Sequence, residues 1–389
     1  MKKIKTYNTI ATIGLEKFSR DHYEVASEII RPDAIMLRSQ NLYDEVIPES
    51  TLAIARAGAG TNNVPVEECS KKGIVVFNTP GANANAVKEL VLSALLLSSR
   101  GIREGIEFAQ NIASDMPASD LSKYIEAEKK RFKGCEIAGK TLGVMGLGAI
   151  GSMVANMALA LGMKVVGYDP ALSVEAAWRL SSKVEKMENL SSLLSQSDFV
   201  SLHVPAIVAT HHLINKESLA SAKQGLCLLN FAREEIVNTD AVIVALNSGL
   251  LSRYVTDFPT TNLLGRKDVI LMPHIGASTR EAEENCAVMA GEQLVAFLEN
   301  GEISNSVNFP TAKMQRTTGY RITFCNENVS GVLGNVLSIL ATEKINVIVM
   351  LNNSRENVAY NILDLEQEPS VALIDKLRQV DNVINVRVL

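Results

Sequence analysis

The first three quarters of the chain alternate short apolar runs with longer mixed segments, which is the pattern of parallel strands joined by helices. The first runs predicted as buried strands are Ala34–Leu37, Leu52–Ala55 and Ile74–Phe77. Each ends in a cluster of turn-forming residues, and a long helical pattern over 83–100 follows the third. Parallel α/β sheets bind ligands in the loops after their strands, so these turns are candidate ligand loops. Residues 102–139 are more polar, and we expect irregular structure there.

The segment Lys140–Pro170 carries the most specific pattern in the chain. An apolar run is followed by a glycine-rich turn, a helical stretch and a second apolar run that ends in an acid. We expect strands over Leu142–Met145 and Lys164–Tyr168, with a helix over about Ala149–Leu161 between them. This order is typical of a dinucleotide-binding unit, in which the amides at the start of the helix face the diphosphate. The alternative is a glycine-rich turn in another doubly wound fold.

The glycines and the acid of this segment have separate physical tasks. Gly146 permits the tight turn, Gly148 leaves the backbone open to a diphosphate, and Gly151 allows the helix to pack closely on the strand. Asp169 can accept hydrogen bonds from ribose hydroxyls, and its charge disfavours a 2′-phosphate. The spacing therefore predicts NAD, rather than NADP, as the cofactor.

The strand–helix alternation continues to about residue 300 and then changes. A long helix over 281–299 is predicted to return the chain to the first domain, and the polar segment 301–310 is predicted to be a linker. Beyond it, the pattern has the ferredoxin-like order βαββαβ. We therefore expect an α/β protein with two doubly wound parallel-sheet domains and a small ferredoxin-like domain. The predicted divisions are 1–97 and 281–310 for the substrate domain with its return helix and linker, 98–280 for the NAD-binding domain, and 315–389 for the small domain.

Composition narrows the class of protein only modestly. With 389 residues, of which 47% are hydrophobic and 21% charged, the chain suits a globular protein of two or three domains. A net charge of −5 without a Lys/Arg cluster argues against nucleic acid as a partner. The five cysteines are scattered and include no CxxC pair, which favours reduced thiols and no metal site. No apolar stretch resembles a signal peptide or a membrane span, so we expect a cytoplasmic protein without a membrane partner.

Two polar residues that follow predicted strands suggest the reaction. His274 can take or give the proton when a hydroxyl becomes a carbonyl. Arg233 can bind a carboxylate through two hydrogen bonds and polarise the adjacent carbonyl. Either residue alone is more often structural, but their shared position at strand ends favours hydride transfer at a 2-hydroxy acid.

Four segments together resemble the D-isomer-specific 2-hydroxyacid dehydrogenases, and the resemblance extends over essentially the whole chain. It is greatest to members with a C-terminal ACT domain. The segments are NTPGANANAVKELV from Asn78, GLGAIG from Gly146, LLNFAREEIV from Leu228 and MPHIGAST from Met272. The resemblance implies a homodimer or homotetramer that oxidises 3-phosphoglycerate to 3-phosphohydroxypyruvate with NAD, the first step of serine synthesis.

Transferred position by position, the resemblance also implies roles for individual residues. His274 would be the acid/base, Arg233 would bind the substrate, and Asp257 would hold the nicotinamide carboxamide. Substrate contacts are implied at Arg38, Ser39, Ala59 and Gly60. Cofactor contacts are implied at Gly146, Gly148, Ala149, Ile150, Gly151, Asp169, Pro205, Ala232 and Asp257.

The chain departs from the family at two catalytic-region positions. Thr261 or Asn262, depending on a one-residue gap, replaces the glutamate that hydrogen-bonds the catalytic histidine, and Asn238 stands where aspartate is common. Three explanations remain open. Glu234 or Glu235 replaces the lost carboxylate, Thr261 or Asn262 holds the imidazole through a neutral hydrogen bond, or the chain has become a sensor that binds NAD without turnover. The alternative enzymatic reading is a dehydrogenase for another D-2-hydroxy acid, such as glycerate or lactate.

The C-terminal segment resembles an ACT domain, which typically binds an amino acid between two copies through its first βα loop. Asn328 and Asn346 match positions that contact the effector in serine-inhibited relatives, and Asn326 falls where those relatives have histidine. We therefore expect L-serine as an effector. The alternative is a domain that serves assembly alone.

Overall fold

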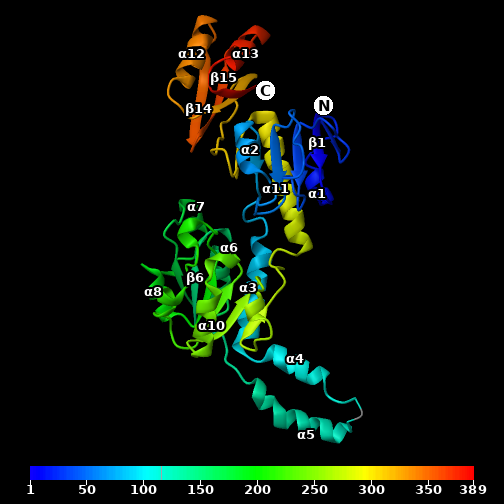
Figure 1. The fold of residues 1–389 in the computed structure, drawn as a ribbon, viewed down its shortest axis with the longest axis vertical. Helices are drawn as coiled ribbons and strands as arrows, with labels where there is room; N and C mark the ends of the chain where they lie inside the picture. Colours follow the sequence, from blue (N-terminus) through cyan, green and yellow to red (C-terminus); the bar gives the residue numbers. More distant parts are fainter. Residues whose placement is uncertain (115) are drawn as a thin grey trace. The chain divides into compact units, whose positions relative to one another are not determined.

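A computed structural model describes residues 1–114 and 116–389 of the chain. The chain divides into two compact units (Figure 1). The first unit combines Met1–Asn83 with Arg280–Leu389, and the second is Ala84–Thr279. Among the described residues, no helix is both long enough and apolar enough to cross a membrane.

The first unit contains a five-stranded parallel sheet in the order β2-β1-β3-β4-β5. Its strands are β1 (Lys2–Thr6), β2 (Tyr23–Ala26), β3 (Ala34–Leu37), β4 (Ala53–Arg56) and β5 (Val75–Phe77). Its helices are α1 (Thr12–Leu15), α2 (Val66–Lys71) and the long return helix α11 (Arg280–Asn300). Apolar residues of the sheet and of α11, such as Met36, Phe77 and Phe297, form one buried core. The three strands predicted here are confirmed to within a residue or two.

The second unit contains a seven-stranded parallel sheet in the order β12-β11-β10-β9-β6-β7-β8. Its strands are β6 (Thr141–Met145), β7 (Lys164–Tyr168), β8 (Glu185–Lys186), β9 (Phe199–Leu202), β10 (Leu226–Asn230), β11 (Leu251–Thr256) and β12 (Val269–Leu271). Its covering helices are α3 (Ala84–Ser99), α6 (Ala149–Ala160), α7 (Val174–Arg179), α8 (Leu190–Gln196), α9 (Lys216–Leu219) and α10 (Thr239–Asn247). The strand order reverses between β6 and β9, and such switch points are where open parallel sheets bind ligands.

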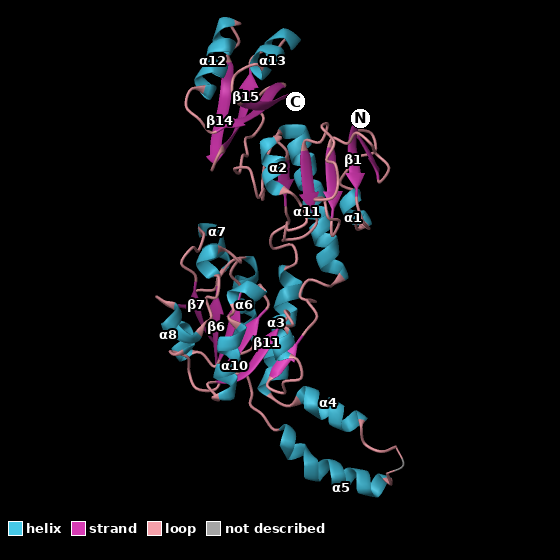
Figure 2. Ribbon diagram, viewed as in Figure 1, coloured by secondary structure: helices cyan, strands magenta, loops and turns pink. Residues whose placement is uncertain are grey.

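The prediction of irregular structure over 102–139 is wrong. This segment forms α4 (Ile102–Gln110) and α5 (Ala118–Glu128), which project from the second unit (Figure 2), and a 3-10 turn over Lys129–Phe132. Neither helix has a buried residue. Instead, Phe108 packs against Tyr124 and Phe132, with ring centroids 5.4 and 5.3 Å apart. The polar composition favoured a loop, but isoleucines at 102 and 106 keep a helical spacing, and this spacing was the better signal.

The C-terminal part of the first unit is a four-stranded antiparallel sheet in the order β14-β15-β13-β16. Its elements are β13 (Tyr320–Glu327), α12 (Val332–Thr342), β14 (Val347–Arg355), β15 (Val358–Leu365), α13 (Val371–Arg378) and β16 (Val383–Val388). The predicted order βαββαβ is confirmed. Phe324, Leu363 and residues of both helices form the core of one face, whereas Tyr360 and Ile362 on the other face join the core of the first unit.

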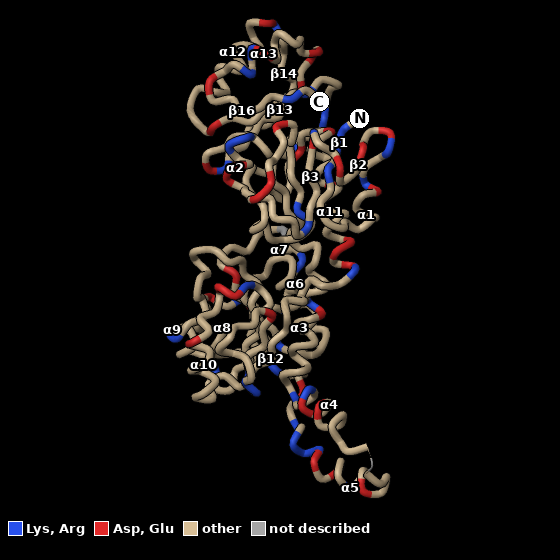
Figure 3. The backbone as a smooth tube through the Cα atoms, turned by 45° about the vertical axis from the view of Figure 1, so that its right-hand side comes forward, with Lys and Arg blue, Asp and Glu red and all other residues tan. Residues whose placement is uncertain are grey.

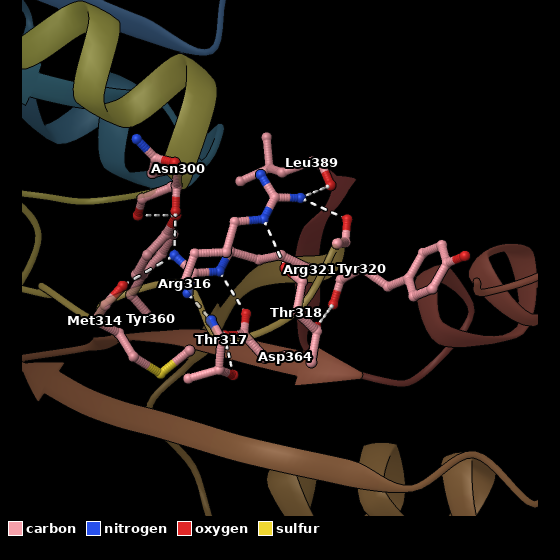
Figure 4. A network of polar contacts seen from close by, with 12 residues as sticks. Asn300, Met314, Arg316, Thr317, Thr318, Tyr320, Arg321, Tyr360, Asp364 and Leu389 are labelled. Atoms are coloured by element: carbon pink, nitrogen blue, oxygen red, sulfur yellow. Dashed lines mark hydrogen bonds and ion pairs between the residues drawn. The ribbon is translucent and has the colours of Figure 1, made fainter. Parts of the chain in front are cut away.

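Polar contacts fasten this small sheet to the end of α11 (Figure 4). Arg321 and Asp364 form an ion pair with both side chains fully buried. The Arg321 Nε and Nη2 donate to the Asp364 carboxylate at 2.6 and 3.0 Å, and Nη1 donates to the carbonyls of Asn300 and Met314 at 3.0 Å each. Thr317 adds two hydrogen bonds of 2.8 Å to Asp364 Oδ2. Because Asn300 ends α11, the network joins the small sheet to that helix.

The segment 301–310, predicted as a polar linker, is fixed along the edge of the parallel sheet. Phe309 is buried, and Ser306 forms an antiparallel bridge with Phe77 of β5. The Asn308 side chain accepts from the Val76 N–H at 2.9 Å and donates to the Ile74 carbonyl at 2.9 Å. The polar residues that favoured a linker therefore satisfy the backbone of an edge strand.

Candidate active site

The predicted cofactor and catalytic residues of the second unit all follow strands of its parallel sheet. Because parallel strands end at the same edge of a sheet, their loops share that edge. The glycine loop follows β6, Asp169 follows β7, Pro205 follows β9, Ala232 and Arg233 follow β10, Asp257 follows β11, and His274 follows β12.

The glycine loop has the geometry that a diphosphate requires. Gly146 has a φ of +85°, and a Cβ on Gly151 would lie 1.9 Å from the Gly146 carbonyl oxygen. A Cβ on Gly148 would meet nothing within 4 Å, so this position faces open space. No side chain caps the start of α6, where Ala149 and Ile150 lie in the first turn. The loop and the helix start therefore fit the diphosphate of NAD.

Asp169 is held by backbone amides of two loops. Its Oδ2 accepts from the Leu147 N–H of the glycine loop at 2.8 Å, and its Oδ1 accepts from the Ala171 N–H at 2.9 Å. Each carboxylate oxygen retains acceptor capacity, so both remain available to ribose hydroxyls. The acid and the glycine loop are thus fixed to each other in the arrangement that NAD binding requires.

His203 is a residue of this edge that the sequence reasoning did not select. It follows β9, and its carbonyl oxygen lies 2.7 Å from where a Cβ on Gly146 would be. Its Nε2 is 2.8 Å from the Ser201 hydroxyl, while its Nδ1 is buried without a hydrogen-bond partner among the described residues. Burial lowers the pKa of His203 to about 3, so the ring is neutral at physiological pH. Its position directly after an apolar strand was the available signal.

Arg233 is oriented by a buried side chain that the sequence analysis also missed. Asn230, at the end of β10, is fully buried. Its Nδ2 donates to the Arg233 carbonyl at 2.8 Å, and its Oδ1 accepts from the Ala232 N–H at 3.1 Å. The Arg233 side chain is exposed, and its Nη1 donates to the Ala232 carbonyl at 2.7 Å. Asn230 therefore fixes the loop, while the guanidinium keeps donors for an anionic ligand.

His274 lies on an exposed turn with an unusual backbone. Its φ is +55°, in the left-handed region, and its ring packs edge-on against Phe258 with centroids 5.0 Å apart. Asp257 is only 2% exposed, and its two oxygens accept from the N–H groups of Ile275 and Gly276 at 2.8 and 2.7 Å. The residue expected to contact the nicotinamide thus also binds the backbone that follows His274.

Thr261 and Asn262, the two candidates for a neutral hydrogen-bond partner of His274, lie in a turn that makes contacts elsewhere. Asn262 donates from Nδ2 to Asp240 Oδ1 at 3.3 Å, and its Oδ1 accepts from the Thr260 hydroxyl at 2.6 Å. Thr261 opens a 3-10 turn over Thr261–Leu263. Within the described parts of the chain, neither side chain hydrogen-bonds to His274.

The two candidate replacement carboxylates are not bonded to His274 in the described structure either. Glu234 and Glu235 lie exposed in a 3-10 turn over Glu234–Ile236, and no hydrogen bond or ion pair joins either to His274 in the portion of the chain that is described. Asn238, the second departure from the family, caps α10 by accepting from the Ala241 N–H at 2.9 Å. An amide oxygen serves as a helix cap as well as a carboxylate does.

In the first unit, the substrate candidates lie at the ends of adjacent strands. Arg38 follows β3, Arg56 ends β4, and these strands pair Leu37 with Arg56. Arg38 Nη2 lies 2.6 Å from Glu283 Oε1 in the first turn of α11, and Arg56 Nε donates to the Arg38 carbonyl at 3.1 Å. Arg56 is not among the residues predicted from the sequence, although it is a charged residue at the end of an apolar strand.

The loop that follows β4 presents backbone donors beside this arginine pair. Asn78 donates to the Ala59 carbonyl at 2.7 Å, which fixes the loop. The N–H groups of Ala59 and Gly60 have no intramolecular acceptor within the described residues. Ser39 donates its own N–H to Asn8 Oδ1 at 3.0 Å and is exposed. The structure thus brings the two amides and Arg38 to one sheet edge.

The three candidate effector residues do not meet within one chain. Asn326 is 4% exposed and accepts from Asn361 Nδ2 at 2.9 Å, and Asn328 donates from Nδ2 to the Glu356 carbonyl at 3.0 Å. Asn346 lies at the opposite end of the small sheet from Asn326. It precedes β14, whose first residue pairs with Leu365 at the end of β15, whereas Asn326 pairs with Ala359 near the start of β15. A site that used all three would need a second copy of the chain.

Comparison with known proteins agrees with this geometry. The family model described as "D-isomer specific 2-hydroxyacid dehydrogenase, NAD binding domain" matches residues 103–276. The D-3-phosphoglycerate dehydrogenase of Haemophilus influenzae is 33% identical over 343 residues, which cover 85% of this chain and 79% of that protein. The enzyme of the same name from Escherichia coli strain K12 is 32% identical over 394 residues, which cover 97% of this chain and 92% of that protein.

A solved structure is similar as well. The NAD⁺-bound 3-phosphoglycerate dehydrogenase of Entamoeba histolytica matches with a TM-score of 0.61 and 26% identity, covering 79% of this chain and 98% of that one. The fold and the sheet-edge site are those of an NAD-dependent oxidoreductase. The chain belongs to the D-isomer specific 2-hydroxyacid dehydrogenase family.

Proposed function

We propose that the chain oxidises 3-phospho-D-glycerate to 3-phosphohydroxypyruvate with NAD, the first step of L-serine synthesis. The observation that carries the proposal is the shared position of the NAD-binding loop, Arg233 and His274 at one edge of the second unit's sheet. The names of the relatives described above support the choice of substrate.

Each proposed residue has a defined task in this oxidation. Arg233 binds the substrate carboxylate and polarises the oxygen on C2. His274 takes the hydroxyl proton as the C2–O bond becomes a carbonyl. Bound NAD would supply the acceptor for the hydride that leaves C2 as the C–H bond breaks, while the O–H proton passes to His274.

The geometry of the second unit supports the proposed cofactor contacts. Gly148 and the amides of Ala149 and Ile150 would hold the diphosphate, because no Cβ fills that space. Asp169 would accept from the ribose hydroxyls. Pro205 and Ala232, which follow β9 and β10, lie on the same edge and would line the rest of the dinucleotide site.

The arginines of the first unit support a phosphorylated substrate. Arg38 would contact the phosphate, with Arg56 adjacent to it. The free N–H groups of Ala59 and Gly60 would bind the carboxylate, and Ser39 is an exposed hydroxyl beside Arg38. Two guanidinium groups at neighbouring strand ends would supply the positive charge that a phosphate dianion requires.

One observation favours a second candidate, the oxidation of an unphosphorylated D-2-hydroxy acid. Arg38 is paired with Glu283 at 2.6 Å, and this carboxylate offsets the charge that would attract a phosphate. Glycerate and D-lactate lack the phosphate and would not compete with Glu283.

Initial rates of NAD reduction distinguish these candidates. We expect turnover with 3-phosphoglycerate and a kcat/KM at least 100-fold lower with glycerate and D-lactate. Equal efficiency with glycerate would favour the second candidate. No turnover with any acid, combined with tight NADH binding, would favour a sensor.

We further propose that two copies of the chain associate through the helical arm of α4 and α5. The arm exposes Ile106 and Ile125 at 53% and 39%, around the aromatic cluster of Phe108. Positively charged lysines and arginines and negatively charged acids both lie along it (Figure 3), which suits antiparallel contact between identical surfaces. A monomeric mass in light scattering at micromolar concentration would contradict this; a dimer or tetramer would support it.

We also propose L-serine as an effector of the small domain, which we interpret as an ACT domain. Because Asn328 and Asn346 are at opposite ends of the sheet, the effector site would combine loops of two copies. Inhibition by millimolar L-serine, lost in Asn346→Ala, would support this. An unchanged rate and melting temperature in excess serine would leave the domain an assembly role. The five cysteines are free, which agrees with the reducing cytoplasm that we propose as its location.

A further inference from the structure

The turn that carries His274 has a backbone conformation that needs support. A φ of +55° is uncommon for a residue with a side chain, although histidine tolerates it better than most. His274 is exposed, and its described ring contact is the edge-on packing against Phe258. The position of the imidazole therefore depends strongly on the backbone on either side of it.

Asp257 binds the backbone directly after this residue. Its Oδ1 accepts from the Ile275 N–H at 2.8 Å, and its Oδ2 accepts from the Gly276 N–H at 2.7 Å. The Asp257 side chain is nearly fully buried, and its own N–H donates to the Asn230 carbonyl at 3.2 Å. A carboxylate that accepts two amides in a buried site forms short, charge-assisted hydrogen bonds. The two amides are thereby fixed relative to β10 and β11.

We infer that Asp257 is the positioning residue of His274 and takes over, through the backbone, the orienting task of the family's missing glutamate. Instead of bonding to the imidazole, it holds the turn after His274 so that the left-handed conformation persists. The inference rests on the proposed function, in which His274 accepts the substrate proton. In the described structure, Thr261, Asn262, Glu234 and Glu235 form no hydrogen bond to His274, whereas Asp257 bonds to the two residues that follow it.

This role differs measurably from a contact to the nicotinamide carboxamide. If Asp257 mainly held the cofactor, its loss would weaken NADH binding and leave kcat at saturating NAD almost unchanged. If it positions His274, its loss lowers kcat and leaves NADH affinity nearly constant. A displacement of about 1 Å in a reacting group reduces the rate by about 100-fold.

The experiment compares Asp257→Asn with a matched control, Asp198→Asn. Asp198 also accepts a backbone N–H, from Thr141 at 2.9 Å, but it precedes β9 at the opposite edge of the sheet. We expect Asp257→Asn to lower kcat 10- to 100-fold, with an NADH dissociation constant within twofold of the wild type. The control is expected to lower the melting temperature without changing kcat by more than twofold.

A double-mutant cycle with His274→Gln tests whether Asp257 acts through the histidine. In the His274→Gln background, adding Asp257→Asn is expected to change the residual rate by less than twofold. The inference would be overturned if Asp257→Asn lowered the rate of His274→Gln by the same factor as it lowers the rate of the wild type. It would also be overturned if Asp257→Asn alone weakened NADH binding tenfold and left kcat normal. If His274→Gln itself keeps the wild-type rate, the proposed function fails instead, so the two failures are distinguishable.

A second variant covers the case in which Asp257→Asn does not fold. A Cβ on Gly276 would lie 3.1 Å from Asp257 Oδ2, so Gly276→Ala displaces the carboxylate slightly without creating a positive φ. We expect a two- to tenfold lower kcat and unchanged NADH affinity. A kcat equal to that of the wild type would count against the inference.

Discussion

The pairing of Arg38 with Glu283 predicts that one carboxylate limits the affinity for a phosphorylated substrate. The two groups are 2.6 Å apart and are 44% and 42% exposed. Glu283→Gln retains a hydrogen-bond acceptor but removes the negative charge. If Arg38 contacts the substrate phosphate, this change will lower the KM for 3-phosphoglycerate.

The magnitude follows from two contributions. Releasing Arg38 from an exposed ion pair costs about 0.2–1 kcal/mol. A phosphate dianion about 6 Å from Glu283 would be repelled by about 1.4 kcal/mol in water, and salt near 0.15 M reduces this by roughly half. The sum is about 0.9 to 1.7 kcal/mol, which corresponds to a roughly five- to eighteenfold lower KM.

Steady-state rates with two substrates measure this effect. The KM for glycerate, which has no phosphate, is expected to stay within twofold in the same variant. Glu292→Gln provides a matched control, because Glu292 lies on the same helix and pairs with Lys17 at 2.7 Å. An unchanged KM for 3-phosphoglycerate in Glu283→Gln, or an equal decrease for glycerate, would show that Glu283 does not limit phosphate binding by Arg38.

Three further predictions concern the cofactor loop, the small domain and a buried histidine. Gly148→Ala, whose Cβ meets nothing within 4 Å, is expected to keep the melting temperature but to weaken NADH binding more than tenfold in a fluorescence titration. Asp364→Ala leaves the buried Arg321 charge unpaired and is expected to destabilise the first unit by about 3–5 kcal/mol in urea unfolding, whereas the surface change Glu343→Ala costs under about 0.5 kcal/mol. Burial lowers the pKa of His203 to about 3, so below pH about 6.5 the imidazole gains a proton only in the unfolded chain. The free energy of unfolding is therefore expected to fall by about 2 kcal/mol between pH 7 and pH 5. In urea unfolding at these two pH values, His203→Asn is expected to remove this decrease.

The parallel-sheet architecture was predictable because each buried strand needs a continuous apolar run. The runs at 34–37, 164–168 and 226–230 match β3, β7 and β10. The glycine loop was equally predictable, since Gly146 and Gly151 occupy positions where a Cβ would collide with backbone oxygen. In these places the local sequence and the fold impose the same requirement.

The helical arm and the fixed segment 301–310 do not follow from composition, because polar residues are as frequent in loops as on exposed helices and sheet edges. Polar residues in α4 and α5 remain exposed on a projecting helix pair, and polar residues such as Asn308 satisfy an edge strand. Polarity indicates exposure or hydrogen bonding, and neither excludes regular structure.

The supporting residues of the site could not be predicted from local sequence. Arg38 and Glu283 are 245 positions apart, and the hydrogen bonds of Asp257 reach residues 18 and 19 positions further along the chain. The sequence shows that a carboxylate follows β11, but only the folded backbone shows which amides it accepts. The chemical groups were therefore predictable, whereas their partners were not.

The proposed oxidation is best examined by measuring NADH formation from 3-phosphoglycerate by the purified chain beside its His274→Gln and Arg233→Gln variants. We expect steady turnover by the wild type, a loss of at least 100-fold in kcat for His274→Gln, and a loss in kcat/KM for Arg233→Gln, all with unchanged NADH affinity. Turnover by His274→Gln equal to that of the wild type would show that His274 is not the acid/base of the reaction.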